Sequence, residues 1–215
     1  MAERLQKQGA DAAMRCPAEE NLAISVAMQY NPFRNREMRN FKMKSKTRWI
    51  TETAIVLALL VILQAVTKSA GQLVTGSCVN AVLAVSVLVS GLSSGLTVAL
   101  LSPFVAFLLG IGPQLLPIVP AIALGNAVYV LLLGRLYGKK PPVWRRGLAL
   151  AGSAGAKFLT LYLVVVKLLC SILPLKPPQI ATFSTMFAWP QLATALIGGA
   201  VALLIVPVIC KALHR

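Results

Sequence analysis

One lysine lies inside a long apolar stretch of this chain. Lys157 belongs to residues 152–167, GSAGAKFLTLYLVVVK, which have the composition of a membrane-spanning helix. A charged side chain near the centre of a bilayer costs roughly 2.5–3.5 kcal/mol on insertion scales. Such a residue is therefore expected to serve a function, as the partner of an ion, a substrate or another polar group.

The acidic residues of the chain cannot pair with Lys157 inside a membrane. All six lie at or before the start of the first apolar span: Glu3, Asp11, Glu19, Glu20, Glu37 and Glu52. A buried lysine without an acidic partner must lose its proton, use backbone carbonyls and water as acceptors, or be neutralised by a molecule that is not protein. The third alternative predicts an anionic ligand such as a carboxylate.

The positions of the acidic residues argue against several kinds of site inside the membrane. Cation-coupled carriers, intramembrane aspartyl proteases and carboxylate-bound metal sites place acids within the membrane. The lone histidine, His214, is at the C-terminal tip, and the four cysteines have no CxxC spacing. The chain also lacks a GxxxxGK[ST] phosphate loop, so it has no means of its own to use ATP. We expect no catalytic residue, no metal site and no cofactor.

Composition predicts a membrane protein. Hydrophobic residues make up 57% and charged residues 13% of the 215 residues, and the mean hydropathy is +0.76. The formal net charge of +15 does not predict nucleic-acid binding, because much of the chain would lie in lipid. We expect an all-α, polytopic protein in a lipid bilayer.

Six apolar runs have about the length needed to cross a bilayer, which is roughly 17–25 residues. They cover approximately residues 49–67, 73–90, 92–110, 114–137, 146–173 and 186–210. The second and third are separated only by Ser90-Gly91-Leu92-Ser93-Ser94-Gly95, which predicts a tight turn. These runs predict a compact bundle of six transmembrane helices.

Basic residues predict the orientation of the bundle. They gather before the first span (Lys44, Lys46, Arg48), between the fourth and fifth spans (Arg135, Lys139, Lys140, Arg145, Arg146) and at the C-terminus (Lys211, Arg215). The opposite loops carry only Lys68 and Lys176. By the positive-inside rule both termini are cytoplasmic. The outward loops, residues 67–72, 110–114 and 174–179, are rich in Gly and Pro and could cover a cavity.

The first 42 residues differ from the rest in their mixed polarity and basic run. They predict a disordered or marginally helical N-terminal extension. Met43 followed by Lys-Ser-Lys-Thr-Arg would be an ordinary start for a membrane protein, so this extension is interpreted as a possible non-native leader. The bundle itself would then comprise residues 43–215.

Lys157 lies about ten residues into the fifth span, or roughly 15 Å at 1.5 Å per residue, which is close to the midplane. Asn126 in the fourth span lies at similar depth. Taken singly, Asn80 and Asn126 more often join helices than contact a ligand. Trp189 has the depth of an interfacial aromatic residue.

From Met43 to its end the chain resembles the substrate-binding S component of energy-coupling-factor (ECF) vitamin transporters. The shared features are six spans, both termini inside, basic cytoplasmic flanks and no ATP site. Residues 52–58, ETAIVLA, also fit the AxxxA pattern through which such components contact the coupling subunit. Ala54 and Ala58 lie one helical turn apart, and their small side chains allow a partner helix to approach.

This resemblance implies a protein of the bacterial plasma membrane that binds a vitamin or related micronutrient in its outward half. Two ATPase subunits and a coupling transmembrane subunit would be its partners, and would drive substrate release inside. The positions that correspond to the binding site offer Gln114, Asn126, Tyr129, Lys157, Tyr162, Trp189 and Gln191. Lys157 would neutralise a carboxylate, with Asn126 and Gln191 fixing its orientation.

Two other functions remain open at the level of sequence. An autonomous secondary carrier or anion channel could use Lys157 as its anion site, although the chain is small and shows no evident inverted repeat. A membrane enzyme could use Lys157 as a base or Schiff-base nucleophile, but no second catalytic group accompanies it.

Overall fold

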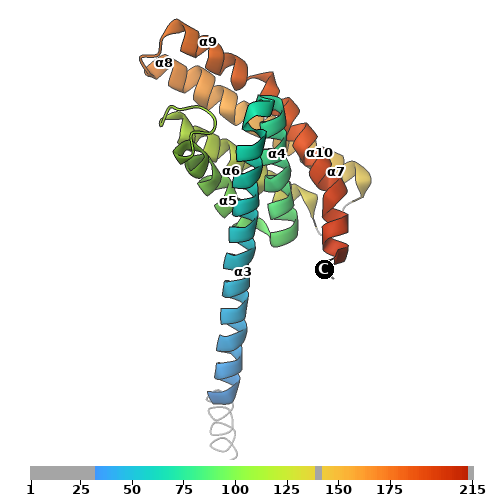
Figure 1. The fold of residues 1–215 in the computed structure, drawn as a ribbon. Coiled ribbons are helices and arrows are strands. Elements are labelled where there is room, and N and C mark those ends of the chain that lie inside the picture. The colour runs from blue at the N-terminus through green and yellow to red at the C-terminus, as the bar shows by residue number, and fades with distance from the viewer. Residues whose placement is uncertain (1–31, 139–141, 213–215) are drawn as a thin grey trace, which may run out of the picture. The chain divides into compact units, whose positions relative to one another are not determined.

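The computed structural model describes residues 32–138 and 142–212, and this part of the chain is helical with no strand (Figure 1). The α-helices are α3 (Pro32–Thr67), α4 (Gln72–Val85), α5 (Leu92–Leu108), α6 (Ile118–Tyr137), α7 (Val143–Leu161), α8 (Cys170–Ile172), α9 (Pro177–Met186) and α10 (Trp189–Ala212). A 3₁₀ turn, η1 (Lys68–Ala70), follows α3. Two π-helical segments, η2 (Ser86–Ser90) and η3 (Tyr162–Leu169), continue α4 and α7.

Among the described residues, five helical segments are long and apolar enough to cross a membrane: Lys46–Ala70, Gln72–Ser90, Ile118–Tyr137, Val143–Ile172 and Pro177–Ala212. They correspond to five of the six predicted spans. The remaining one, α5, has 17 residues, which is about 25 Å at 1.5 Å per residue. This length is at the lower end of the range for a crossing, and α5 is a shorter apolar helix than the five segments above.

The predicted tight turn between the second and third spans is confirmed at Gly91. The π-helical end of α4 stops at Ser90, and α5 begins at Leu92. Gly91 has a φ of +94°, a backbone conformation that favours glycine because it has no Cβ. One residue thus reverses the chain. A buried hydrogen bond of 2.9 Å between Thr53 Oγ1 on α3 and Ser94 Oγ joins α5 to α3.

Two boundaries differ from the prediction. The fourth helix begins at Ile118 instead of residue 114, because α5 ends at Leu108 and a non-helical loop follows. The last predicted loop, residues 174–179, is cut short by α9, which starts at Pro177; proline suits the first turn of a helix because that turn needs no N–H donor. In Figure 1, α8 and α9 meet at a sharp reversal at the top of the view.

Helices α4 and α10 pack closely through small residues. A methyl group added at Gly198 on α10 would lie 2.8 Å from Asn80 Cβ and against the carbonyl oxygen of Ser77, both on α4. A methyl at Gly76 on α4 would lie 3.0 Å from Thr194 Cγ2 on α10. The pair of helices is held at the distance that these glycines allow, and this distance sets the position of Asn80.

By its internal contacts the chain divides into two units, Met1–Arg48 and Trp49–Arg215. The second unit holds both buried apolar clusters of the described residues, one around Leu83, Val98 and Tyr129 and the other around Ile118 and Val165. Within the predicted extension, residues 32–42 form the first turns of α3, and residues 1–31 lie outside the described part of the chain.

The α4–α10 contact yields a first prediction. Gly198→Ala should destabilise the protein by about 1–3 kcal/mol, because the added methyl overpacks a contact between two backbones. Gly155→Ala is the matched control, since a Cβ at Gly155 meets nothing within 4 Å. Thermal unfolding in detergent should therefore show a lower Tm than the parent for Gly198→Ala but not for Gly155→Ala. Equal Tm values for the two variants would contradict the close approach.

Candidate functional site

The amine of Lys157 is buried and held by two side-chain amides. Its Nζ donates hydrogen bonds to Asn80 Oδ1 at 2.6 Å and to Asn126 Oδ1 at 2.7 Å. Lys157 and Asn126 are each 3% exposed, and Asn80 is 1% exposed. The three residues come from α7, α4 and α6, so one amine joins three helices.

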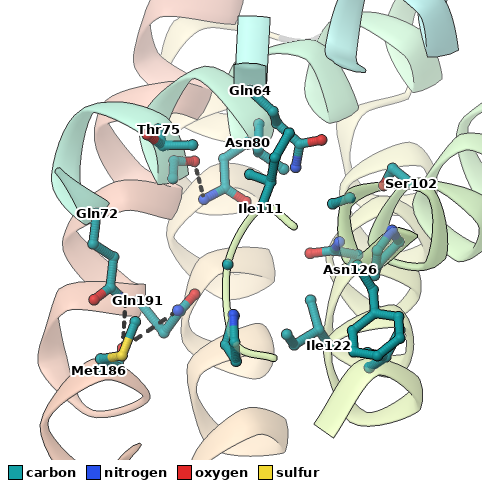
Figure 2. A pocket seen from close by; sticks show the side chains of 18 of the residues that line it. Gln64, Gln72, Thr75, Asn80, Ser102, Ile111, Ile122, Asn126, Met186 and Gln191 are labelled. Carbon is teal, nitrogen blue, oxygen red and sulfur yellow. Dashed lines mark hydrogen bonds between the residues drawn. The ribbon is translucent and has the colours of Figure 1, made fainter. Parts of the chain in front are cut away.

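The amide of Asn80 is turned toward the lysine by its other contacts. Asn80 Nδ2 donates to the backbone oxygen of Gly76 at 2.9 Å and to Thr194 Oγ1 at 3.3 Å. Both amide hydrogens are used on this side, so the oxygen is left to face Lys157. Figure 2 shows the bond from Asn80 to the α4 backbone as a dashed line. The orientation of this acceptor therefore depends on the close α4–α10 contact.

An aromatic ring supports the same amine. Lys157 Nζ lies 5.5 Å from the centroid of the Tyr129 ring, which is fully buried on α6. A cation in this position is attracted by the electrons of the ring, by about 0.5–2 kcal/mol. The Tyr129 hydroxyl donates a long bond of 3.4 Å to the Ala195 carbonyl. The amine therefore has an aromatic face in addition to two amide oxygens.

A cavity of about 290 Å³ opens above this amine. Its apolar lining includes Val79, Pro103, Ala106, Phe107, Ile111, Pro113, Val119, Ile122, Met186 and Phe187. Its polar lining is Gln64, Lys68, Gln72, Thr75, Asn80, Ser102, Asn126, Lys157 and Gln191. An apolar cavity with a few convergent polar groups is the usual form of a small-molecule site.

The charges in the cavity wall have one sign. Lys157 and Lys68 both line the cavity. No Asp or Glu follows Glu52 in the sequence, so none lies among the lining residues. The amide oxygens accept hydrogen bonds from Lys157 without cancelling its charge. A protonated Lys157 therefore leaves a net positive charge in a largely apolar space.

Two glutamines in the cavity wall share one acceptor. Gln72 Nε2 on α4 and Gln191 Nε2 on α10 both donate to the Met186 carbonyl, at 2.8 and 3.4 Å. In Figure 2 this group lies in the lower left of the view, while Asn80 and Gln64 lie at the upper centre and Ser102 and Asn126 lie on the right. The loop that carries Ile111 runs between the side with Asn80 and the side with Asn126. This part of the wall is thus formed by Met186 at the end of α9 and by the α5–α6 loop.

The comparisons with known proteins agree with this architecture. A family model described as ECF transporter, substrate-specific component, matches residues 48–210. The chain belongs to this family. It is the substrate-specific S component of an ECF transporter and a multi-pass membrane protein. The comparisons with curated proteins and with solved structures gave no match.

The structure brings together part of the predicted binding set of this S component. Asn126, Lys157 and Gln191 line the cavity, and Tyr129 lies behind the Lys157 amine. The other three predicted residues are absent from the cavity lining. Gln114 is exposed and bonds the Gly112 carbonyl, Tyr162 stacks on Phe158, and Trp189 is 66% exposed. Their contact with a substrate stays a prediction.

Other lining residues were not singled out from the sequence. The sequence predicts that Asn80 joins helices and that Gln72 ends an outward loop over a cavity, but it does not identify Gln64 or Ser102 as site residues. Gln64 and Ser102 each interrupt an apolar run with a polar side chain, and that signal could have identified them. Both have a buried oxygen, Oε1 and Oγ respectively, that forms no hydrogen bond in the structure.

The two alanines of the AxxxA pattern lie on the surface of α3. Ala54 and Ala58 are both exposed, whereas Thr53 and Leu60 on the same helix are buried. The helix thus presents its small residues away from the bundle core. A second helix could approach α3 closely along this face.

The lysine–amide contacts yield a second prediction. Asn80→Leu should destabilise the protein more when Lys157 is present than in a Lys157→Met background. The difference should be about 1.5–3 kcal/mol, the usual value of a hydrogen bond to a charged group. Unfolding of the two single variants and the double variant in detergent measures it as a coupling energy.

Thr160→Val is the control for that cycle. Thr160 donates a hydrogen bond to the Ala156 carbonyl on the same helix. The effects of Thr160→Val and Lys157→Met on the free energy of unfolding should therefore be additive. Additive effects of Asn80→Leu and Lys157→Met would contradict the bond between these residues.

Proposed function

We propose that this S component captures a small organic anion, a vitamin or related micronutrient with a carboxylate, from the outer side of a bacterial plasma membrane. It would release the substrate inside when coupled to a transmembrane coupling subunit and two ATPase subunits. The single observation that carries the proposal is the amine of Lys157, held by neutral acceptors in the wall of a cavity without acids.

The hydrogen bonds of Lys157 offset the cost of its burial. Two bonds to a charged donor contribute about 1.5–3 kcal/mol each, and a lysine at a helix centre costs roughly 2.5–3.5 kcal/mol. An ammonium held in this way keeps one N–H for a further acceptor. A carboxylate at about 4 Å would gain on the order of 4 kcal/mol of attraction at an effective dielectric constant of 20. The same cavity would exclude cations.

The position of the cavity supports capture from outside. Its lining includes the α3–α4 connection at Lys68 and Gly71, the α5–α6 loop at Ile111, and the α9–α10 junction at Phe187. These three connections are on the side opposite the basic loops, which the positive-inside rule assigns to the cytoplasm. With six crossings and both termini inside, substrate would enter past α9 and these loops.

A coupling partner has a suitable surface on α3. The exposed Ala54 and Ala58 offer a face to which a helix of the coupling subunit can come close. Binding there would leave the cavity free, because neither alanine lines it.

Mass spectrometry of small molecules released from the purified full chain tests the proposed substrate class. The parent should release a carboxylate-bearing compound, and Lys157→Met should release at least about tenfold less, because a charge-assisted hydrogen bond is lost. Lys167→Met is the matched control. Lys167 is exposed, lies 5.8 Å from the Tyr162 ring and does not line the cavity.

A neutral compound retained equally by the parent and Lys157→Met would contradict the anionic substrate. An empty parent that also fails to bind added vitamins would contradict the binding function itself. Uptake into liposomes then separates an importer from a carrier or channel. We expect uptake only with the coupling subunit, both ATPases and ATP, and uptake by the chain alone would favour the carrier or channel.

The proposed coupling surface yields a further prediction. Ala54→Leu with Ala58→Leu should reduce copurification of the coupling subunit, because the larger side chains hold the partner helix away. Ligand retention should not change. Ala151→Leu, at an exposed alanine of α7, is the matched control. Loss of copurification in both variants would show only a general effect of surface leucines and would contradict the assigned face.

A further inference from the structure

Two buried oxygens that belong to the cavity wall have no hydrogen-bond partner. They are Gln64 Oε1 on α3 and Ser102 Oγ on α5. Gln64 is 8% exposed and Ser102 is 1% exposed, and both side chains line the cavity. Buried polar side chains in proteins are nearly always paired, since an unpaired one is costly. Two unpaired groups in one cavity point to a ligand that would pair them.

These groups are separate from the set that holds the lysine. The Lys157 amine is bound from α4 and α6, whereas Gln64 and Ser102 come from α3 and α5. In Figure 2, Gln64 and Asn80 lie at the upper centre of the view and Ser102 and Asn126 on the right, with Gln72 and Gln191 on the left. The cavity wall therefore offers a charged donor and two neutral polar groups without partners.

The chemistry of the pair limits what it can bind. The amide oxygen of Gln64 is an acceptor only, so its partner must carry an N–H or O–H. The hydroxyl of Ser102 both donates and accepts. A hydroxyl or an amide on the ligand supplies a donor and an acceptor close together and so suits both. A plain hydrocarbon end would leave both groups unpaired.

We propose that the substrate is a carboxylic acid that also bears a neutral hydroxyl or amide group, which Gln64 and Ser102 bind while Lys157 binds the acid. This inference rests on the proposed function, because it uses the same cavity and the same anion site. The cavity of about 290 Å³ equals roughly ten water volumes at 30 Å³ each. A small organic acid of this kind fits a cavity of that size.

Binding of matched probes to the purified full chain tests this proposal. The probes are hexanoate, the hydroxyhexanoates with the hydroxyl at each carbon from the second to the sixth, and adipic acid monoamide, titrated by calorimetry. At least one hydroxy or amide acid should bind about tenfold or more tightly than hexanoate, since a site that hydrogen-bonds a polar group rejects the analogue that lacks it.

Variants assign the preference to the two side chains. The parent should bind the preferred hydroxy or amide acid more tightly than hexanoate. Gln64→Leu and Ser102→Ala should each bring the ratio of these two affinities closer to one. Ser153→Ala is the matched control, because Ser153 is buried, bonds the Leu150 carbonyl and does not line the cavity; it should keep the parent ratio. The unliganded Gln64→Leu and Ser102→Ala proteins should unfold at the parent Tm or above, because each loses an unpaired buried group.

Other results would contradict the polar subsite, the role of the two side chains or the proposed function. Equal affinity for all acids, or a preference that survives both variants, would overturn the polar subsite and leave the proposed anion site in place. A lower Tm of the unliganded variants with an unchanged ratio would assign Gln64 and Ser102 to packing. Failure of every acid to bind would overturn the proposed function, and this inference with it.

Discussion

A buried amine that is bonded without being neutralised is the constraint on which the rest of this structure depends. Lys157 needs acceptors because it cannot reach water easily, and the chain provides no acid beyond Glu52. Asn80 and Asn126 supply amide oxygens from two different helices. The lysine is thereby held in place, and the neutral amide oxygens do not cancel its charge.

The packing of the bundle follows from holding those acceptors in position. Asn80 faces the lysine because Gly76 and Thr194 take its amide hydrogens. Thr194 is within reach because Gly198 lets α10 approach the backbone of α4. Small residues on these helices, which by themselves are common in membrane bundles, thus affect the orientation of Asn80 in the proposed binding site. The contact between α4 and α10 orients the Asn80 amide, and this amide holds the amine of Lys157 in the cavity wall.

Much of the fold could be predicted from the sequence, because apolar runs and Gly91 mark helices and a turn locally. The burial of Lys157 inside an apolar run and its lack of an Asp or Glu partner could also be predicted from the sequence. The amide partners of Lys157 could not be predicted, because Asn80 and Asn126 lie 77 and 31 residues away along the chain. Nor could the direction of Tyr162 be predicted, because it begins a π-helical segment in which the usual helical periodicity does not apply.

A structure of the substrate-loaded protein is the measurement that tests the central claim most directly. The account predicts an acidic group of the substrate within hydrogen-bond distance of Lys157 Nζ, with the bonds from Lys157 to Asn80 and Asn126 still present. A bound substrate whose charged group lies away from Lys157, or a neutral substrate packed against it, would contradict the claim that this amine is the anion site.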